Sequence, residues 1–374
     1  MTDTPAQFGV LGVQETRDWP ALTREEVAAV LEPYGLPPVA GDVAWHGQRP
    51  FSATGIVPLE DGRNVFLKRH DLRLRDATAL AEEHGFADHL AAKDLPVSLA
   101  SFTLAGQRSV QRDGWIYEVY PELEGDDLYR DVQSWGAFLS DDDAYNAGKT
   151  LALLHLAAAD YDAPARPHRP LVSSCGLIIR PDFEAELEAW VVAEPGLSAA
   201  LEGRDWKEEV AQQTRPYRKA LEPYLADLTP CWGHGDWHGS NLAWKDGAVS
   251  GIFDFGMSDR TFAAFDLAVA IERSAVAWLN LDDPDPVRYE QLSAMMFGYE
   301  SYHLLTPSDY AMMIGFLPLV HVEFALSEVA YYGTLLGDRA GADVAYGDYL
   351  LGHLRWFGSD PGRDLLDWLV NELP

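Results

Sequence analysis

The sequence predicts an α+β fold with two lobes, a small β-rich lobe over residues 1–121 and a larger, mostly helical lobe over residues 122–374. Residues 43–68 contain short apolar segments separated by turns, which is the pattern of β-hairpins, and two further strand-like runs follow at residues 98–104 and 115–120. In the second part of the chain, apolar side chains recur at helical spacing, as at Leu151 and Leu154. A length of 374 residues also exceeds the usual size of one domain, which favours two lobes.

The small lobe is expected to begin with a helix and to continue as hairpins. Thr23 and Glu26 have the spacing of a capping box, so a short helix is predicted over residues 25–31. The turn Asp61-Gly62 separates two strand-like runs. A helix with one apolar face then follows at residues 76–92. The predicted strands are residues 53–59, 64–68, 98–104 and 115–120.

The large lobe is expected to be helical except for one hairpin. Its predicted helices are residues 144–159, 185–193, 206–225, 266–279, 286–304, 309–336 and 344–357. The turn Lys245-Asp246-Gly247 joins short apolar runs at residues 242–244 and 250–253, which predicts a hairpin. Polar motifs flank this hairpin, in the loops where rigid scaffolds usually present catalytic groups.

Composition excludes several classes of protein. The formal net charge of −31 argues against a nucleic-acid partner, because a phosphate backbone needs a basic surface. Acid gathered around a cleft would favour a cationic substrate, whereas acid spread over the surface would only aid solubility. We find no apolar run of 18 residues and no secretory signal, so neither a membrane span nor export is expected. Two cysteines without CxxC spacing suit a reducing cytoplasm, and oligomeric state is not readable.

One stretch has the residues that phosphoryl transfer to a hydroxyl requires. That reaction needs a carboxylate to orient the nucleophile and accept its proton, together with oxygen ligands for magnesium. Asp236 and Asn241 lie five residues apart and can face each other across one loop. Asp254 follows 18 residues after Asp236, beyond the predicted hairpin, and can complete a metal site. The three residues predict the catalytic loop and the metal loop of a kinase.

The same residues carry a family resemblance. The motif HGDWHGSN at residues 234–241 resembles the HGDxHxxN catalytic loop of the aminoglycoside phosphotransferase and choline kinase superfamily, relatives of protein kinases. The segments IFDFG and FDLA resemble its metal-binding segment and the run that follows. The resemblance implies a protein-kinase-like bilobal fold that binds ATP and Mg²⁺ between its lobes. It implies that Asp236 is the catalytic base, that Asn241 and Asp254 bind magnesium, and that Asp266 is a buried structural acid.

Two histidines of the catalytic loop have different expected roles. We interpret His234 as a hydrogen-bonding residue that braces the loop. His238 either lines the site and touches the substrate or supports the loop, and the sequence leaves both alternatives open. Neither histidine has the spacing of a zinc ligand.

Lys68 is the predicted phosphate clamp. It ends the apolar run Val65-Phe66-Leu67, where a cation can reach the nucleotide phosphates if a carboxylate on the next helix fixes its direction. Glu82 and Glu83 both lie on that helix. The segment LAEEHGF resembles the "EEHxF" helix of the branch that contains stress-response kinase A and homoserine kinase-like proteins, and this resemblance favours Glu83 as the partner.

The nucleotide-covering loop departs from the protein-kinase pattern, because residues 48–55 contain no GxGxxG. Ser52 and Thr54, with backbone amides, are the candidates there for holding phosphates. The run Glu118-Val119-Tyr120-Pro121 resembles the hinge whose backbone reads the adenine edge, so Glu118 and Tyr120 are candidate cofactor contacts in a hinge near residues 118–125.

The acceptor pocket is expected to come from the helical lobe. Asp259 and Arg260 follow the metal loop closely, and Glu323 lies on an aromatic-rich helix with His321, Tyr331 and Tyr332. Together with His238, the residues Asp259, Arg260 and Glu323 are the candidate substrate contacts, whereas His155 is expected to be a satisfied core histidine.

Three functions remain open from the sequence. The first is a small-molecule kinase acting on a sugar, an amino alcohol or an aminoglycoside-like alcohol. The second is a protein Ser/Thr kinase similar to stress-response kinase A, and the third is a non-catalytic nucleotide-binding module. Only 12 residues separate Asp254 from Asp266, which leaves little room for a peptide-docking activation segment and favours the first. The intact set of Lys68, Asp236, Asn241 and Asp254 argues against the third.

Overall fold

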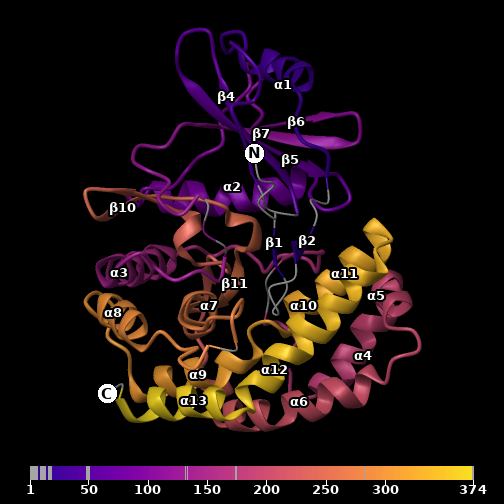
Figure 1. The fold of residues 1–374 in the computed structure, drawn as a ribbon, viewed down its shortest axis with the longest axis vertical. Helices are drawn as coiled ribbons and strands as arrows, with labels where there is room; N and C mark the ends of the chain where they lie inside the picture. The colour runs from indigo at the N-terminus through magenta and orange to yellow at the C-terminus, as the bar shows by residue number, and fades with distance from the viewer. Residues whose placement is uncertain are drawn as a thin grey trace.

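The computed structural model describes residues 7–8, 14–15, 19–47, 51–130, 132, 134–172, 175–281 and 283–372. A β-sheet lobe lies at one end of the molecule and a larger helical lobe at the other (Figure 1). Near the N-terminus, β1 (Gln7–Phe8) pairs with β2 (Gln14–Glu15) in the antiparallel sense.

The small lobe is built on a five-stranded antiparallel sheet. Its strands lie in the order β3-β4-β5-β7-β6. Their bounds are Trp45–His46 (β3), Ala53–Pro58 (β4), Asn64–Asp71 (β5), Ser109–Arg112 (β6) and Trp115–Pro121 (β7). In the register of this sheet Thr54 lies opposite Lys68, and Lys68 lies opposite Glu118. Because facing residues share one side of a sheet, these three side chains lie in one row across it.

Two helices accompany the sheet. The predicted capping box is present, with Thr23 and Glu26 at the start of α1 (Arg24–Leu31), which runs into the 3₁₀ turn η1 (Glu32–Tyr34). Helix α2 (Ala77–Ala91) begins at Asp76, whose side chain accepts a hydrogen bond from the Ala79 amide, and lies beneath the sheet in Figure 1. The predicted strand at residues 98–104 is wrong, because this segment only runs beside β7 and is joined to it by the bond from Ser101 N to Val119 O.

The large lobe is mostly helical, as predicted, but its long predicted helices are divided. The run expected at residues 309–336 is interrupted at Pro318, which has no amide hydrogen to donate. The helices are α3 (Asp141–Ala158), α4 (Phe183–Ala193), α5 (Pro195–Ala200), α6 (Trp206–Leu221), α7 (Ala263–Ala275), α8 (Tyr289–Glu300), α9 (Pro307–Phe316), α10 (Val322–Ala330), α11 (Arg339–Val344), α12 (Leu351–Phe357) and α13 (Asp360–Glu372). Shorter 3₁₀ or π turns are Glu222–Asp227 (η2), Gly239–Asn241 (η3), Phe255–Met257 (η4), Leu317–Leu319 (η5), Tyr331–Leu336 (η6) and Ala345–Leu350 (η7).

Two small antiparallel pairs carry the polar loops of the large lobe. Strand β8 (Pro230–Gly233) pairs with β11 (Asp259–Phe262), and β9 (Leu242–Lys245) pairs with β10 (Ala248–Ile252). The predicted turn between β9 and β10 is present, with positive φ at Asp246 and Gly247 as two-residue hairpin turns require. The chain leaving β7 is tied to this hairpin, because Asp126 and Trp244 exchange two backbone hydrogen bonds.

Buried apolar residues form two clusters. The smaller one fills the space between α1 and the sheet, and the larger one fills the helical lobe and includes Phe86 and Leu90 of α2. Helix α2 therefore belongs to the small lobe in sequence but packs against the core of the large lobe. The stretch Pro307–Leu336 has the length and composition of a membrane span, but 89% of its most apolar window is buried inside the protein, as in a core helix.

Helices α3 and α8 cross with almost no space between their backbones. A Cβ atom on Gly148 of α3 would lie 1.9 Å from the carbonyl oxygen of Met295, and one on Gly298 of α8 would lie 2.0 Å from that of Tyr145. Both distances are far below van der Waals contact. Only glycine at these two positions permits the helices to pack this closely.

Candidate active site

A cavity of about 350 Å³ lies between the lobes. Five predicted site residues from the small lobe line it, namely Ser52, Thr54, Lys68, Glu83 and Tyr120. From the large lobe, the predicted residues in its wall are Asp236, His238, Asn241 and Asp254. The structure therefore brings together residues separated by up to 202 positions, from Ser52 to Asp254, around one enclosed space.

The catalytic loop is held from below by Asp266. This acid lies in the first turn of α7 and is fully buried, and it accepts hydrogen bonds from the amides of His234 (2.8 Å) and Gly235 (2.7 Å). His155 of α3 lies 3.0 Å from the same carboxylate and also contacts the Tyr299 hydroxyl at 2.8 Å. Asp266 is thus the buried structural acid that the resemblance implied, and His155 is the satisfied core histidine that we expected.

Gly235 is required where the loop turns. Its φ is +77°, and a Cβ atom there would lie 2.2 Å from the carbonyl oxygen of Met257. A side chain would therefore be strained twice, by the left-handed backbone and by the collision.

His234 joins the catalytic loop to the metal loop. Its Nε2 lies 3.0 Å from the Phe253 carbonyl oxygen, and its Nδ1 accepts from the Asp236 amide at 3.3 Å. A carbonyl oxygen can only accept, so Nε2 carries the hydrogen and the ring is in one defined tautomer. The predicted bracing role is confirmed by this geometry.

Asp236 is surrounded by charged and polar side chains. Arg273 Nε lies 2.9 Å from its Oδ1, while Asn241 Nδ2 and His238 Nε2 lie 3.2 and 3.4 Å from its Oδ2. Burial alone would raise the pKa of Asp236, but the charges of Arg273 and His238 more than offset burial and hold the pKa well below its usual value. The carboxylate is therefore ionised at neutral pH, as a group that accepts a hydrogen bond from a hydroxyl must be.

Sequence reasoning missed Arg273. It lies on α7 seven residues after Asp266, two helical turns further along the same face, so both side chains point toward the catalytic loop. That spacing from the FDLA motif was the signal that could have identified it.

Lys68 and Asp254 form an ion pair across the cavity. Lys68 Nζ lies 2.8 Å from Asp254 Oδ1. Burial lowers the pKa of Lys68, but the neighbouring Asp254 and Glu118 more than offset burial and raise it overall, so the ammonium stays charged. Asp254 has φ of +62°, an uncommon conformation for a residue other than glycine and one that recurs at functional sites.

The donor set fits a hard divalent cation such as Mg²⁺. Asn241 donates through Nδ2 to the Asp236 backbone oxygen (2.9 Å) and carboxylate, so its amide oxygen is the atom that can ligate a metal. Asp254 adds a carboxylate that faces the same cavity. Carboxylate and amide oxygens are the ligands that magnesium prefers, with remaining positions left to water and phosphate.

Glu83 does not pair with Lys68, and this prediction is wrong. Its Oε1 lies 2.9 Å from Arg75 Nε and 2.8 Å from Arg166 Nη2, and all three side chains are buried. Both guanidinium groups also donate to the carbonyl oxygen of Gly256 in the metal loop, each at 3.0 Å. Two fixed cations satisfy Glu83 better than one flexible lysine, so it braces the metal loop against α2.

Glu118 is also placed differently from the prediction. Its backbone is paired with β5 on one side and β6 on the other, so it is not free to read an adenine edge. Its buried carboxylate lies 2.6 Å from His84 Nε2 and 3.1 Å from His70 Nε2, and it accepts from the Tyr120 hydroxyl at 2.7 Å. Tyr120 does line the cavity, where the chain leaves the sheet.

Ser52 and Thr54 line the cavity as predicted for a nucleotide-covering segment. Thr54 faces Lys68 across the β4–β5 pair. The other part of that predicted loop, residues 48–50, lies outside the described residues.

Three of the four candidate substrate residues are not among the described residues that line the cavity. Asp259 is buried and accepts from the Arg166 and Arg260 amides, each at 2.7 Å. Arg260 points outward and is partly exposed. Glu323 is buried and accepts from the amides of Leu177 and Ile178 at 2.8 and 3.0 Å. Strand β11 and helix α10 therefore direct these side chains into the protein or to the surface, away from the cavity.

The acceptor side of the cavity comes from neighbouring positions. His238 lines the cavity and also contacts Asp236 of the catalytic loop, so the two alternative placements are compatible. The cavity is lined instead by Phe324 and Glu328 of α10, and by His321 immediately before that helix. Arg273 completes that wall.

The comparison with known families agrees with this geometry. The sequence model of the phosphotransferase enzyme family matches residues 56–305, more than half of the chain. The chain belongs to the phosphotransferase enzyme family. The matched range contains Lys68, Asp236, Asn241 and Asp254, and the family resemblance stated from the motifs is confirmed.

Relatives of this family member are kinases in name. A homoserine kinase from Gluconobacter oxydans (strain 621H) is 31% identical over 179 residues, which cover 44% of this chain and 46% of that protein. Stress response kinase A from Escherichia coli (strain K12) is 27% identical over 244 residues, which cover 65% of this chain and 64% of that protein. The chain thus spans about half the length of the first relative and under two thirds of the second.

A solved structure supports the fold. A spectinomycin phosphotransferase, solved with ADP and spectinomycin, superposes with a TM-score of 0.55 at 13% identity, covering 95% of this chain and 100% of that chain. The predicted kinase-like α+β fold is therefore confirmed.

Proposed function

We propose that this protein transfers the γ-phosphate of ATP to a hydroxyl group of a small molecule. The observation that carries the proposal is the meeting of Lys68, Asp236, Asn241 and Asp254 in the wall of one cavity between the lobes. These residue types supply each part that phosphoryl transfer needs, namely a phosphate-binding cation, a carboxylate for the nucleophile and oxygen ligands for a metal.

The chain's own residues divide the work between binding and positioning. Lys68 holds the nucleotide phosphates from the sheet, and Asn241 with Asp254 would hold Mg²⁺. When bound, the metal neutralises charge on the phosphates and orients them. Asp236 accepts a hydrogen bond from the attacking hydroxyl and keeps it in line with the phosphorus. Because its pKa is held low by Arg273, Asp236 mainly orients the hydroxyl, and the proton moves late in a loose transition state.

Features next to the metal loop favour a small acceptor over a protein. Within three residues of Gly256 the chain enters β11, which is paired along its whole length with β8. This described segment is therefore built into the lobe and offers no free stretch for docking a peptide. Relatives named for homoserine and spectinomycin phosphorylation fit an acceptor of modest size.

The charges of the acceptor wall favour an amine-bearing alcohol. Glu328 and Asp236 supply negative charge on this side of the cavity, and Arg273 supplies a single fixed cation between them. An ammonium group on the acceptor would be attracted to the two carboxylates, and a carboxylate on the acceptor could meet Arg273.

The proposal is tested by incubating the purified chain with Mg²⁺ and labelled ATP against sugars, amino alcohols, aminoglycosides and a generic protein substrate. We expect transfer to at least one amine-bearing alcohol, and loss of at least 1000-fold in kcat for Asp236→Asn with ATP binding retained. Asp162→Asn, at an exposed carboxylate, is the matched control and should keep full activity. Transfer only to protein, or unchanged turnover in Asp236→Asn, would contradict the proposal.

A further inference from the structure

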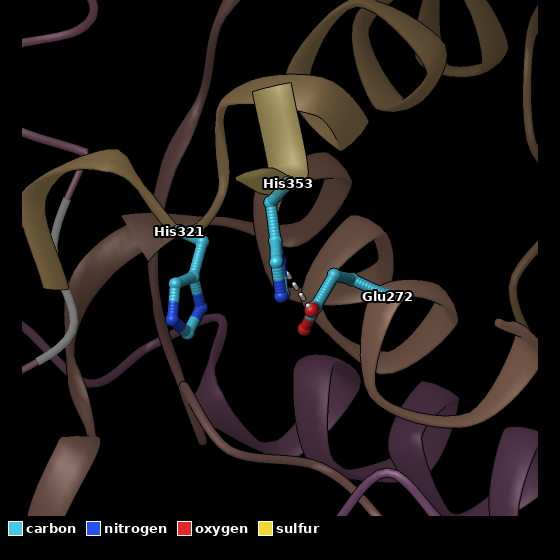
Figure 2. Close-up of side chains that lie close together, drawn as sticks. All are labelled: Glu272, His321 and His353. Carbon is cyan, nitrogen blue, oxygen red and sulfur yellow. Dashed lines mark ion pairs between the residues drawn. The ribbon is translucent and has the colours of Figure 1, made fainter. Parts of the chain in front are cut away.

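Behind the catalytic loop, three segments bring a carboxylate and two imidazoles together. Glu272 lies on α7, His321 immediately precedes α10, and His353 lies on α12. Their nearest ligand atoms all lie within 4.8 Å of one another. Figure 2 shows the carboxylate of Glu272 beneath the ring of His353, with the ring of His321 beside them.

These three side chains are buried, and they make few hydrogen bonds among the described residues. Their exposed fractions are 1% for Glu272, 5% for His321 and 2% for His353. Among the described residues, no hydrogen-bond partner is found for Glu272 Oε1, for His321 Nε2 or for either ring nitrogen of His353. Glu272 Oε1 lies 3.1 Å from His353 Nδ1, yet the contact is not aligned as a hydrogen bond. Buried polar atoms left in this state cost free energy, and such clusters in native proteins usually have a use.

The surrounding packing holds the rings in place. His353 stacks on Trp278 with ring centroids 3.8 Å apart and planes 4° from parallel. His321 also stacks on His353, with ring centroids 4.7 Å apart. Rings fixed in this way lose little rotational freedom on binding a ligand, which lowers the cost of assembling a site.

We propose that Glu272, His321 and His353 bind a divalent transition-metal cation of the zinc class. Two imidazole nitrogens and one carboxylate oxygen form the mixed set that zinc accepts, whereas magnesium and calcium prefer oxygen alone. The fourth coordination position is left to water, and the carboxylate of Glu328 lies beside the cluster, with its Oε2 3.7 Å from His321 Nε2.

The geometry requires a modest contraction. Two ligands about 2.1 Å from a tetrahedral zinc ion are about 3.4 Å apart. The ligand atoms, now within 4.8 Å of one another, therefore need to draw together by at most about 1.4 Å.

The cation has a way in and a connection to the catalytic loop. His321 and Glu328 line the cavity between the lobes, so a metal can enter from there. Arg273, next to Glu272 in sequence, lies 3.8 Å from the Glu272 carboxylate and 2.9 Å from that of Asp236. A cation bound to Glu272 removes its pull on Arg273 and leaves that guanidinium to Asp236 alone. The metal site itself does not depend on the proposed function.

The test is a direct binding measurement on the full chain. Zinc chloride is titrated calorimetrically into metal-free protein in excess Mg²⁺, which occupies oxygen-only sites on this acidic surface. We expect one zinc ion per chain, retained through gel filtration and counted by elemental analysis. His353→Gln and Glu272→Gln should each weaken zinc binding at least 100-fold. His89→Gln, which removes an imidazole remote from the cluster, should leave the affinity unchanged.

A second measurement tests the proposal in the unmodified chain, in case a variant fails to fold. Co²⁺ replaces zinc in the unmodified chain, and its intense visible absorption reports tetrahedral coordination with nitrogen ligands. Zinc should also raise the unfolding temperature of the unmodified chain but not that of His321→Gln. Equal zinc affinity in the unmodified chain and in a folded Glu272→Gln variant overturns the proposal. Weak octahedral Co²⁺ absorption in the unmodified chain overturns it as well.

Discussion

Replacing Arg273 with methionine tests how the chain keeps Asp236 ionised. Methionine retains an unbranched side chain that can still pack beside Trp135 and Phe324, whose rings lie 5.5 and 5.9 Å from the guanidinium carbon. The change therefore removes the charge with little loss of packing. Asp236 is left largely buried, and it keeps its contacts with His238 and Asn241.

The expected loss of stability follows from this burial. Removing one partner of a fully buried ion pair costs about 3–5 kcal/mol. The Asp236 side chain is 16% exposed to the cavity and keeps two donors, so we expect about 2–3 kcal/mol at pH 7. In the unmodified protein the pKa of Asp236 is lower in the folded state than in the unfolded state. The ionised carboxylate therefore stabilises the fold at pH values above the unfolded-state pKa, and this stabilisation is lost as pH falls through the folded-state pKa. In Arg273→Met this stabilisation is already absent at pH 7, because the guanidinium charge that lowers the pKa of Asp236 has been removed.

The assay is urea unfolding of both proteins between pH 4 and pH 8. The difference in unfolding free energy should be largest at neutral pH and should shrink toward pH 4, because protonation relieves the unpaired carboxylate of the variant. Adding Asp236→Asn to Arg273→Met should restore part of the stability. Arg260→Met, at a partly exposed arginine 4.0 Å from Asp162, is the control and should cost less than about 1 kcal/mol. A difference below about 0.5 kcal/mol at pH 7, or one independent of pH, would refute the reasoning.

Three further predictions concern carboxylates in and around the metal loop. Burial raises the pKa of Asp259 to about 6, so Asp259→Asn should stabilise the protein by about 1–3 kcal/mol at pH 8, with the gain vanishing below pH 4, as measured by urea unfolding. Asp254→Ala should remove the magnesium dependence of ATP affinity, as measured with a fluorescent nucleotide. Glu83→Gln should lower the unfolding free energy by about 3 kcal/mol, because Arg75 and Arg166 lose their shared buried carboxylate, as measured calorimetrically.

Each of these three predictions has an outcome that would contradict it. A loss of stability in Asp259→Asn at pH 8 would mean that its carboxylate is favoured in the ionised form. Normal enhancement of ATP binding by magnesium in Asp254→Ala would exclude this residue as a metal ligand. If Glu83→Gln weakened ATP binding while leaving stability unchanged, Glu83 would belong to the phosphate site after all.

The catalytic and metal loops could be predicted from the sequence because their chemistry depends on short-range spacing. Asp236, Asn241 and Asp254 lie within 19 residues of chain, and one hairpin is enough to bring them together. The capping box of α1 and the turn at Asp246 were predictable for the same reason.

Residues that depend on the path of the whole chain were harder to place. Glu83 was assigned to Lys68, whereas its partners are Arg75, eight residues away, and Arg166, which lies 83 residues away and carries no motif. The backbone of Glu118 was expected to read the adenine edge, but it is paired with β6. Glu323 and Glu328 share one helix, and only the rotation of α10 decides which of them faces the cavity. Helical rotation and strand order are tertiary properties that local patterns do not contain.

The glycine crossing of α3 and α8 has a consequence for how this protein can vary. His155 on α3 and Tyr299 on α8 meet at 2.8 Å, and His155 in turn holds Asp266 beneath the catalytic loop. One added methyl group at Gly148 or Gly298 would push the helices apart and carry this hydrogen-bonded chain with them. The position of the catalytic loop is thus set partly by a contact between two helix backbones, remote from any nucleotide. We therefore expect substitution of either glycine to lower catalytic turnover as well as stability.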